Sequence, residues 1–343
     1  MYPPDRYCDY LFYTEVVVSG QTLQASRVEA SWQMFQQLAR SYSRVKPGVA
    51  FDYGRTSVQS IQDASGSLAV LQQNNIRHYA ILNAFVRNAR QEYPNLLQTI
   101  YAMKTLQGGD QTRKTVLAVG LHDYSVQNGV NLIRALTNVL AVPLADIVIA
   151  ISSSGRLQSG ADCIAAPPVS FKSRNPRFPS VRDLTVVART GARYNSSLAI
   201  AGLSYQLGAI VYQLSSDAPD VASIPYAQCV QSNITSMDVI CRHGPPQAVE
   251  AAPTIDVFVG RVKSTQAVGG YLSPNDRKNV FLSENALGFN ALLFDLASDG
   301  IQFRSRTAWL LFDVHLHSPS CTPDLLKTLC ESYKHAGPDV FSC

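Results

Sequence analysis

The chain has 343 residues, of which 46% are hydrophobic and 16% are charged, enough to bury a large core as one large domain or two small ones. Its 29 Lys and Arg against 25 Asp and Glu give a formal charge of +4 without any basic run, which argues against nucleic acid and anionic lipid as partners. Polar residues interrupt the longest apolar segment, residues 132–151, so no window reaches the ~18 apolar residues of a membrane span. We expect no nucleic-acid or membrane partner.

The first half of the chain alternates short, β-rich apolar segments with amphipathic ones. Within 93–106, for example, Leu96, Leu97, Ile100 and Met103 recur at a spacing of three or four, as on one face of a helix. The predicted strands here are 8–18, 47–54, 78–85 and 115–124, and the predicted helices are 29–42, 93–106 and 128–140.

The second half continues with strands at 145–154 and 197–207. Residues 208–254 break the alternation, since they contain two cysteines and the turn sequence HGPP, and we interpret them as an insertion. Strands at 255–262 and 308–316 follow, with a helix at 283–300 that ends on Gly300 as a C-cap.

Alternating helices and nearly continuous apolar strands indicate a buried parallel sheet. Eight strands over this length predict a (β/α)8 TIM barrel of class α/β, with a small α+β insertion. The alternative, a doubly wound nucleotide-binding sheet, lacks a G-x-G-x-x-G after any strand. We expect one domain, with barrel segments at 1–207 and 255–343 and the insertion at 208–254.

The cysteines and sequons favour an extracellular protein. Seven cysteines show no C-x-x-C or other metal-binding spacing, and glycosylation sequons begin at Asn195 and Asn233. The first ten residues have neither a basic nor an apolar region, so this chain shows no signal peptide, and secretion would imply a mature or truncated form. One candidate disulfide joins Cys229 to Cys241, whereas Cys163 is the cysteine most expected to stay a free buried thiol. The full set of disulfide candidates is Cys229, Cys241, Cys321, Cys330 and Cys343.

Several segments, in this order, resemble glycoside hydrolase family 18, the chitinases and chitinase-like proteins. These are CDYLFYTEVVV, PGVAFDYG, NNIRHYAILNAF, ADIVIAISSSG, SLAIAGLSYQLG and AWLLFDVHLHSPSC. The resemblance covers nearly the whole chain through strand order and spacing. It implies the barrel fold and a Trp309 at the floor of a sugar pocket, with Tyr205, one place from the family's Tyr position, in the same remnant cleft. The chain looks closest to degenerate secreted members of arthropods.

The segment NNIRHYAILNAF occupies the place of the family's D-x-x-D-x-D-x-E strand but contains no carboxylate. Arg77, Ala80, Leu82 and Ala84 stand at the four acidic positions. An alanine cannot protonate a glycosidic oxygen, and shifting the alignment by one residue supplies no acid either. The resemblance therefore implies a barrel without catalytic residues.

The N-terminus leaves two alternatives. The family begins with a strand before the one at 8–18, and only seven residues precede Cys8. Either the chain lacks the family's first strand, or a different strand closes the barrel.

A metal site is an alternative source of chemistry. In WLLFDVHLH the odd positions Trp309, Asp313, His315 and His317 share one face, which we expect to point into the barrel while the even face packs on helices. His122 or Asp123 is a further candidate ligand. With only six histidines in the chain, hydrogen-bonded histidines at a polar barrel end explain the pattern as well.

Other polar groups at the strand ends are ambiguous. Asp52 and Tyr53 end a predicted strand and either bind ligand or cap the next helix. The serines in ISSSG form no nucleophile motif.

We therefore predict a catalytically inactive, secreted, monomeric chitinase-like protein that binds a glycan or a protein partner and needs no cofactor. Its ligand-binding candidates are Trp309, Tyr205, Asp52 and Tyr53. The alternatives are a residual or metal-dependent glycoside hydrolase using Asp313, His315 and His317, and a structural or storage protein without a ligand cleft.

Overall fold

The structure is a computed structural model. It describes residues 2–5, 7–25, 28–154, 158–170, 173, 175–193, 199–217, 223–236, 238, 247–250, 255–257, 262–264, 267–272, 279–284 and 307–316.

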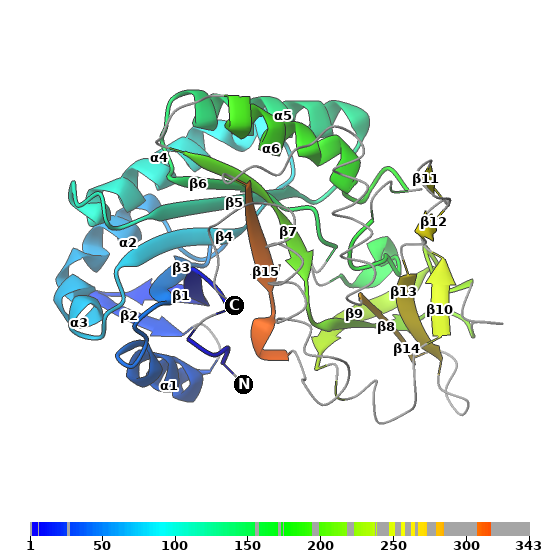
Figure 1. The fold of residues 1–343 in the computed structure, drawn as a ribbon, viewed down its shortest axis with the longest axis horizontal. Helices are drawn as coiled ribbons and strands as arrows, with labels where there is room; N and C mark the ends of the chain where they lie inside the picture. Colours follow the sequence, from blue (N-terminus) through cyan, green and yellow to red (C-terminus); the bar gives the residue numbers. More distant parts are fainter. Residues whose placement is uncertain are drawn as a thin grey trace.

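A curled, mainly parallel sheet forms the larger part of the molecule (Figure 1). Its strand order is β15-β7-β6-β5-β4-β3-β1-β2, and every neighbouring pair is parallel except the β1–β2 hairpin. Among the described strands, β15 and β2 are the two edges, so the sheet is an open half-barrel. This confirms the predicted α/β class. The strands are β1 (Tyr10–Ser19), β2 (Thr22–Ala25), β3 (Lys46–Phe51), β4 (His78–Val86), β5 (Thr115–Leu121), β6 (Ile147–Ala150), β7 (Ile200–Gln206) and β15 (Thr307–Phe312).

Helices cover the convex side of this sheet (Figure 1). The boundaries of α4 follow from its sequence, because Asn88 accepts the N–H groups of Arg90 and Gln91 at its start and Gly108 ends it in the left-handed conformation. None of the described helices is both long and apolar enough to cross a membrane. The helices are α1 (Glu29–Ala39), α2 (Val58–Asp63), α3 (Leu68–Gln73), α4 (Ala89–Gln107), α5 (Val126–Ala141) and α6 (Val181–Arg193), with 3₁₀ turns η1 (Ala64–Ser67), η2 (Gly160–Asp162) and η4 (Val314–Leu316).

The two faces of the sheet carry different apolar cores. On β4, Tyr79 and Ile81 belong to the large cluster that includes the helices, whereas Ala80 and Leu82 belong to a second cluster made of strand residues only. This second cluster fills the concave side of the half-barrel with small and branched side chains. Its members are Ala50, Ala80, Leu82, Val116, Ala118, Ile147, Ile149 and Ile151, with Tyr10, Phe12, Phe85, Ala308, Leu310 and Phe312 packed against them.

An antiparallel sheet forms the smaller part of the molecule, in the order β10-β13-β14-β8-β9. Its strands span residues 209–284, so it extends beyond the predicted insertion at 208–254. The predicted barrel strand at 255–262 is wrong, because this segment forms the two-stranded hairpin of β11 (Ile255–Val257) and β12 (Val262–Ser264). The five strands are β8 (Ala209–Leu214), β9 (Cys229–Thr235), β10 (Gln247–Glu250), β13 (Ala267–Leu272) and β14 (Asn279–Glu284).

The predicted helix at 283–300 lies mostly outside the described residues, and its first two positions belong to β14. The remaining predicted helices and strands are confirmed with shifted ends. The last strand, for example, ends at Phe312 rather than at residue 316, because Asp313 takes a positive φ of 56° and η4 follows.

Candidate functional site

A hollow lies at the carboxyl ends of β4, β5 and β6, the end of a parallel barrel where ligand sites are found. The hollow is shallow: its own cavity volume is about 20 Å³, and the figure rises to about 280 Å³ only when the open solvent at its mouth is included. Strand ends supply part of its wall, and the loop that leads from β6 to α6 supplies the rest. The lining residues are Phe85, Leu121, His122, Tyr124, Ser153, Ser154, Gln158, Arg177, Phe178 and Pro179.

The lining of the hollow combines aromatic rings with polar groups. Phe85 comes from the end of β4, where its ring packs over Gly120; a Cβ at Gly120 would approach it to 2.9 Å. The ring of His122 meets Phe85 edge-on with centroids 6.3 Å apart. Aromatic faces beside hydrogen-bonding groups suit a sugar, which has apolar ring faces and a hydroxyl perimeter.

The serines after β6 hold one wall in place rather than act as nucleophiles. The hydroxyl oxygen of Ser204, on β7, accepts the N–H groups of Ser152 and Ser153 at 2.9 and 3.0 Å and lies 2.8 Å from the Ser153 hydroxyl. Ser152 donates its own hydroxyl to the carbonyl of Ser204. All three serines are buried, so these bonds fix the end of β6 against β7.

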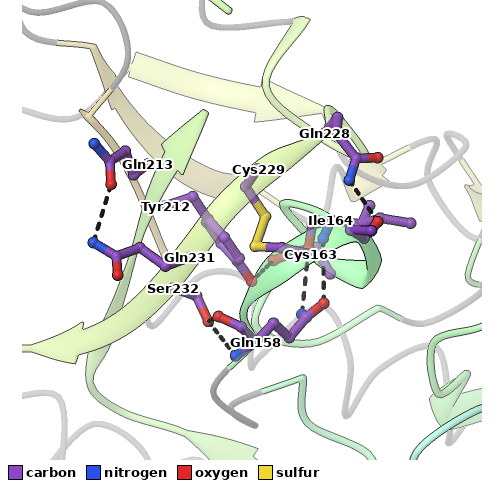
Figure 2. Close-up of a disulfide and its surroundings, with 11 residues drawn as sticks. Gln158, Cys163, Ile164, Tyr212, Gln213, Gln228, Cys229, Gln231 and Ser232 are labelled. Carbon is purple, nitrogen blue, oxygen red and sulfur yellow. Dashed lines mark hydrogen bonds between the residues drawn. A yellow bond between two sulfur atoms is a disulfide. The ribbon is translucent and has the colours of Figure 1, made fainter. Parts of the chain in front are cut away.

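The second wall is attached to the antiparallel sheet through Gln158 (Figure 2). The Gln158 N–H donates to the Ser232 hydroxyl at 2.7 Å, and its carbonyl accepts the Ser232 N–H at 2.8 Å. The side chain of Gln158 bonds both the N–H and the carbonyl of Ile164. Gln158 is therefore fixed from two sides before any ligand arrives.

A disulfide between Cys163 and Cys229 reinforces the same connection (Figure 2). It joins the β6–α6 loop to β9 across 66 residues of sequence, and Tyr212 donates its hydroxyl to the carbonyl of Ala166 beside it. Two expectations are thereby wrong: Cys163 is not a free thiol, and Cys229 does not pair with Cys241. Among the described residues, Cys8 is the free cysteine, and burial raises the pKa of its thiol to about 11.

The four positions aligned with the family's acids are spread over β4 and its approach. Arg77 is exposed before the strand begins, at the end opposite the hollow. Ala80 and Leu82 lie on the concave face, whereas Ala84 lies on the helix-facing side because the register shifts between Ile81 and Ala84. Phe85 rather than a carboxylate continues the concave face to the hollow.

The carboxylates nearest the strand ends each have a structural partner. Asp52 accepts the N–H of Gly54 at 3.0 Å and the amide of Asn83 at 3.3 Å. Asp123 accepts the N–H of Ser125 at 3.1 Å. The amide of Gln206 donates to Asp313 at 2.5 Å, and none of these three acids lines the hollow.

The four predicted ligand-binding residues lie outside the lining of the hollow. Tyr205 is fully buried among the helix-facing residues. Trp309 is partly buried and packs on the same side, while its neighbours Ala308 and Leu310 face the concave side. The expected orientation of the last strand is therefore reversed.

Asp52 and Tyr53 form a separate polar network beside α4. The amide oxygen of Asn83 accepts the Tyr53 N–H at 3.0 Å, and Asn95 donates to the Tyr53 hydroxyl at 3.0 Å.

The alternative metal ligands do not share a strand face. Asp313 follows the end of β15, and His315 is exposed in η4. His317 lies outside the described residues. Within the described part of the chain, no group of three His, Cys, Asp or Glu side chains is placed to hold a metal ion.

The sequon at Asn233 is exposed on β9, whereas Asn195 lies outside the described residues. The same holds for the four remaining disulfide candidates, Cys241, Cys321, Cys330 and Cys343.

The sequence pattern did not identify the residues of the hollow as a group. Phe85, His122 and Ser153 stand at ends of predicted strands. Because ligand sites of parallel barrels lie at the carboxyl ends of the strands, these three residues could have been predicted as candidates. Arg177 and Phe178 come from a loop without regular pattern and could be placed only by the structure.

Comparison with known proteins identifies the fold. No protein-family model and no curated protein matches the chain. Among solved structures, the family GH18 chitinase of Cycas revoluta superposes with a TM-score of 0.62 at 10% identity, over 96% of this chain and 94% of the chitinase; it has been solved with allosamidin and with (GlcNAc)3. The chitinase-like agglutinin RobpsCRA of Robinia pseudoacacia superposes with a TM-score of 0.59 at 13% identity, over 95% and 94%. The glycoside hydrolase family 18 N-acetylglucosaminidase of Paenibacillus barengoltzii gives 0.57 at 9%, over 96% and 94%. The chain has the fold of the family 18 chitinases.

Proposed function

We propose that this protein is a catalytically inactive, chitinase-like binding protein that holds a glycan in the hollow at the ends of β4, β5 and β6. The observation that carries the proposal is the concave face of β4, where Ala80, Leu82 and Phe85 lead to the hollow without a carboxylate. The retained fold and the aromatic, hydrogen-bonding lining support binding. The missing acid argues against hydrolysis.

Hydrolysis of a glycosidic bond needs a proton donor beside the leaving oxygen. No Asp or Glu of the part of the chain that the structure describes lines the hollow. Asp52, Asp123 and Asp313, each hydrogen-bonded to a partner of its own, are not among the lining residues and so do not supply the absent acid there.

The chitinase fold and the N-acetylglucosamine oligosaccharides bound in similar structures make chito-oligosaccharides the natural first probe. Calorimetric titration with chitotetraose, followed by mass analysis of the recovered sugar, tests the proposal. Binding with intact sugar supports it. Shortened products overturn the claim of inactivity, and absence of heat with every glycan tried overturns glycan binding and leaves a protein partner as the remaining function.

Two variants locate the site. Phe178→Ala removes a ring from the hollow and should weaken binding about tenfold, on the scale of one aromatic contact. Trp309→Ala tests the ligand position first expected on β15. Loss of binding in Trp309→Ala alone would place the glycan away from the hollow.

We further propose that the protein is secreted. A disulfide persists in oxidising compartments, and the Cys163–Cys229 bond supports this assignment.

A further inference from the structure

We infer that the hollow selects a saccharide carrying a carboxylate, such as a uronic acid, over neutral chitin fragments. This inference rests on the proposed function, because it names the ligand class of the same site. It starts from the sign of the charge in the hollow.

Among the described residues, the hollow is lined by a cation and by no anion. Arg177 is its permanently charged residue, and the other lining groups are aromatic, hydroxyl, amide, imidazole or aliphatic. The chitinase reaction, by contrast, needs carboxylates at this end of the barrel. A hollow that lacks these acids and carries a guanidinium from the β6–α6 loop favours an anion over a developing cation.

The backbone of Arg177 is fixed while its charged group remains accessible. Its N–H donates to the side chain of Asn175 at 3.0 Å, and its carbonyl accepts the N–H of Tyr124 at 3.3 Å. The side chain is 38% exposed. A side chain whose backbone is fixed and whose charged group is exposed can bind a ligand with a small loss of conformational entropy.

The ion pair of Arg177 with Asp162 does not satisfy the guanidinium. One nitrogen, Nη2, lies 3.2 Å from Asp162, whose side chain is 85% exposed. Such exposed pairs contribute about 0–1 kcal/mol, and a guanidinium has five N–H donors. A ligand carboxylate can therefore bind beside Asp162 or displace it.

The remaining lining fits the rest of a sugar ring. Phe178, the next residue after Arg177, and Tyr124, whose N–H donates to the Arg177 carbonyl, offer aromatic surface in the hollow, and Ser154 and Gln158 bring hydrogen-bonding groups. Stacking and hydroxyl contacts position the ring, and Arg177 then distinguishes a charged ring from a neutral one.

The test compares three probes by calorimetry on the full-length protein at low and at moderate salt. They are a hyaluronan tetrasaccharide, the same tetrasaccharide with its carboxylates methyl-esterified, and chitotetraose. The acidic sugar should bind about tenfold more tightly than its ester, and added salt should reduce this advantage.

Variants assign the effect to Arg177. Arg177→Gln should remove the tenfold preference for the acid over the ester, and Arg177→Lys should restore part of it. Asp162→Asn should strengthen binding of the acidic sugar about two- to threefold, because a competing carboxylate is gone. Arg134→Gln, an equal charge change at an exposed position of α5, is the matched control and should retain the preference.

The outcomes separate this inference from the proposed function. Equal affinity for the acid and its ester, or a preference that survives Arg177→Gln, overturns the inference while glycan binding stands. No binding of any of the three sugars overturns both. Thermal denaturation of each variant establishes that it is folded before its affinity is interpreted.

Discussion

At the scale of single residues, His78 is the clearest case of a side chain whose chemistry is set by burial. It begins β4, packs edge-on against Tyr10 with centroids 5.1 Å apart, and accepts the N–H of Lys114 on Nδ1 at 3.0 Å. Burial, followed by the nearby charges of Lys46, Lys114 and Arg77, lowers its pKa from 6.5 to about 4. The neutral imidazole is therefore the form that the fold accommodates.

This pKa predicts a loss of stability in mild acid. Since the folded pKa lies below the unfolded value, the unfolded chain binds more protons between pH 6.5 and about 4. The free energy of unfolding should then fall across this window by up to about 3 kcal/mol. Urea denaturation at pH 7, 6, 5 and 4.5 measures the slope, and His78→Gln, whose amide can still accept the Lys114 N–H, should flatten it.

His315→Gln, the same substitution at an exposed position, is the matched control for that experiment. Asp146 contributes to the free energy of unfolding in a different, lower pH range. Hydrogen bonds from Thr115 and Lys104 hold its pKa below 3.8. Its stabilisation is therefore present above that value and disappears as the pH falls further. An unchanged slope in His78→Gln would show that another group causes the acid sensitivity.

At the scale of elements, β4 and β15 show what the sequence pattern can and cannot predict. Apolar runs located both strands because a buried parallel strand is apolar on both faces. Because both faces are apolar, the pattern does not show which face is concave and which faces the helices. A register shift of one residue moves every side chain to the opposite face. The shift between Ile81 and Ala84 turns Phe85 to the concave side, and the last strand carries Trp309 on its helix-facing side.

The connection between the β6–α6 loop and β9 is a second element that spacing could not predict. The two cysteines lie 66 residues apart, and seven cysteines allow many pairings. Local reasoning favoured Cys229 with Cys241 because they are close in sequence. The structure pairs Cys229 with Cys163 because bridges Ile164–Gln228 and Ser159–Gln231 bring the loop beside β9.

Removing this disulfide should destabilise the protein and loosen one wall of the hollow. Loop closure across 66 residues corresponds to about 3–4 kcal/mol. The double variant Cys163→Ala/Cys229→Ala should lose that free energy of unfolding in chemical denaturation. It should also bind glycan several-fold more weakly, because Gln158 lies on the same loop.

Cys8→Ser is the matched control for the disulfide variant, since it removes a described free cysteine and should retain both stability and binding. If the double variant lost stability but kept the affinity of the folded protein, the hydrogen bonds between Gln158 and Ser232 would be sufficient to hold the wall.

At the scale of the whole molecule, the sequence pattern predicted the class of fold. It did not predict which residues belong to the parallel sheet and which to the antiparallel sheet. Alternation of strands and helices gave the parallel α/β sheet, because that order forces parallel pairing. The predicted barrel strand at 255–262 instead contributes β11 and the start of β12, which pair with each other in a separate two-stranded sheet. Apolar runs of similar length form in both sheets, so composition alone could not assign the segment at 255–262.

The outer edge of β9 is relevant to self-association of the protein. The loop at 158–164 covers this edge through Gln228, Gln231 and Ser232, while Asn233 and the strand end beyond it are not covered by that loop. Uncovered edges offer N–H and carbonyl groups to a second chain. A glycan on the exposed Asn233 would block such pairing.

Expression in a secretory eukaryotic host should therefore give protein whose mass falls after N-glycan removal. Asn233→Gln and Thr235→Ala both destroy this sequon, and the second keeps the asparagine itself. Each should lose one glycan by intact mass and should show more self-association in sedimentation velocity, since the strand edge is then exposed. If both variants kept the wild-type mass, Asn233 would be unmodified; if they lost the glycan and stayed monomeric, the edge of β9 would not need a cover.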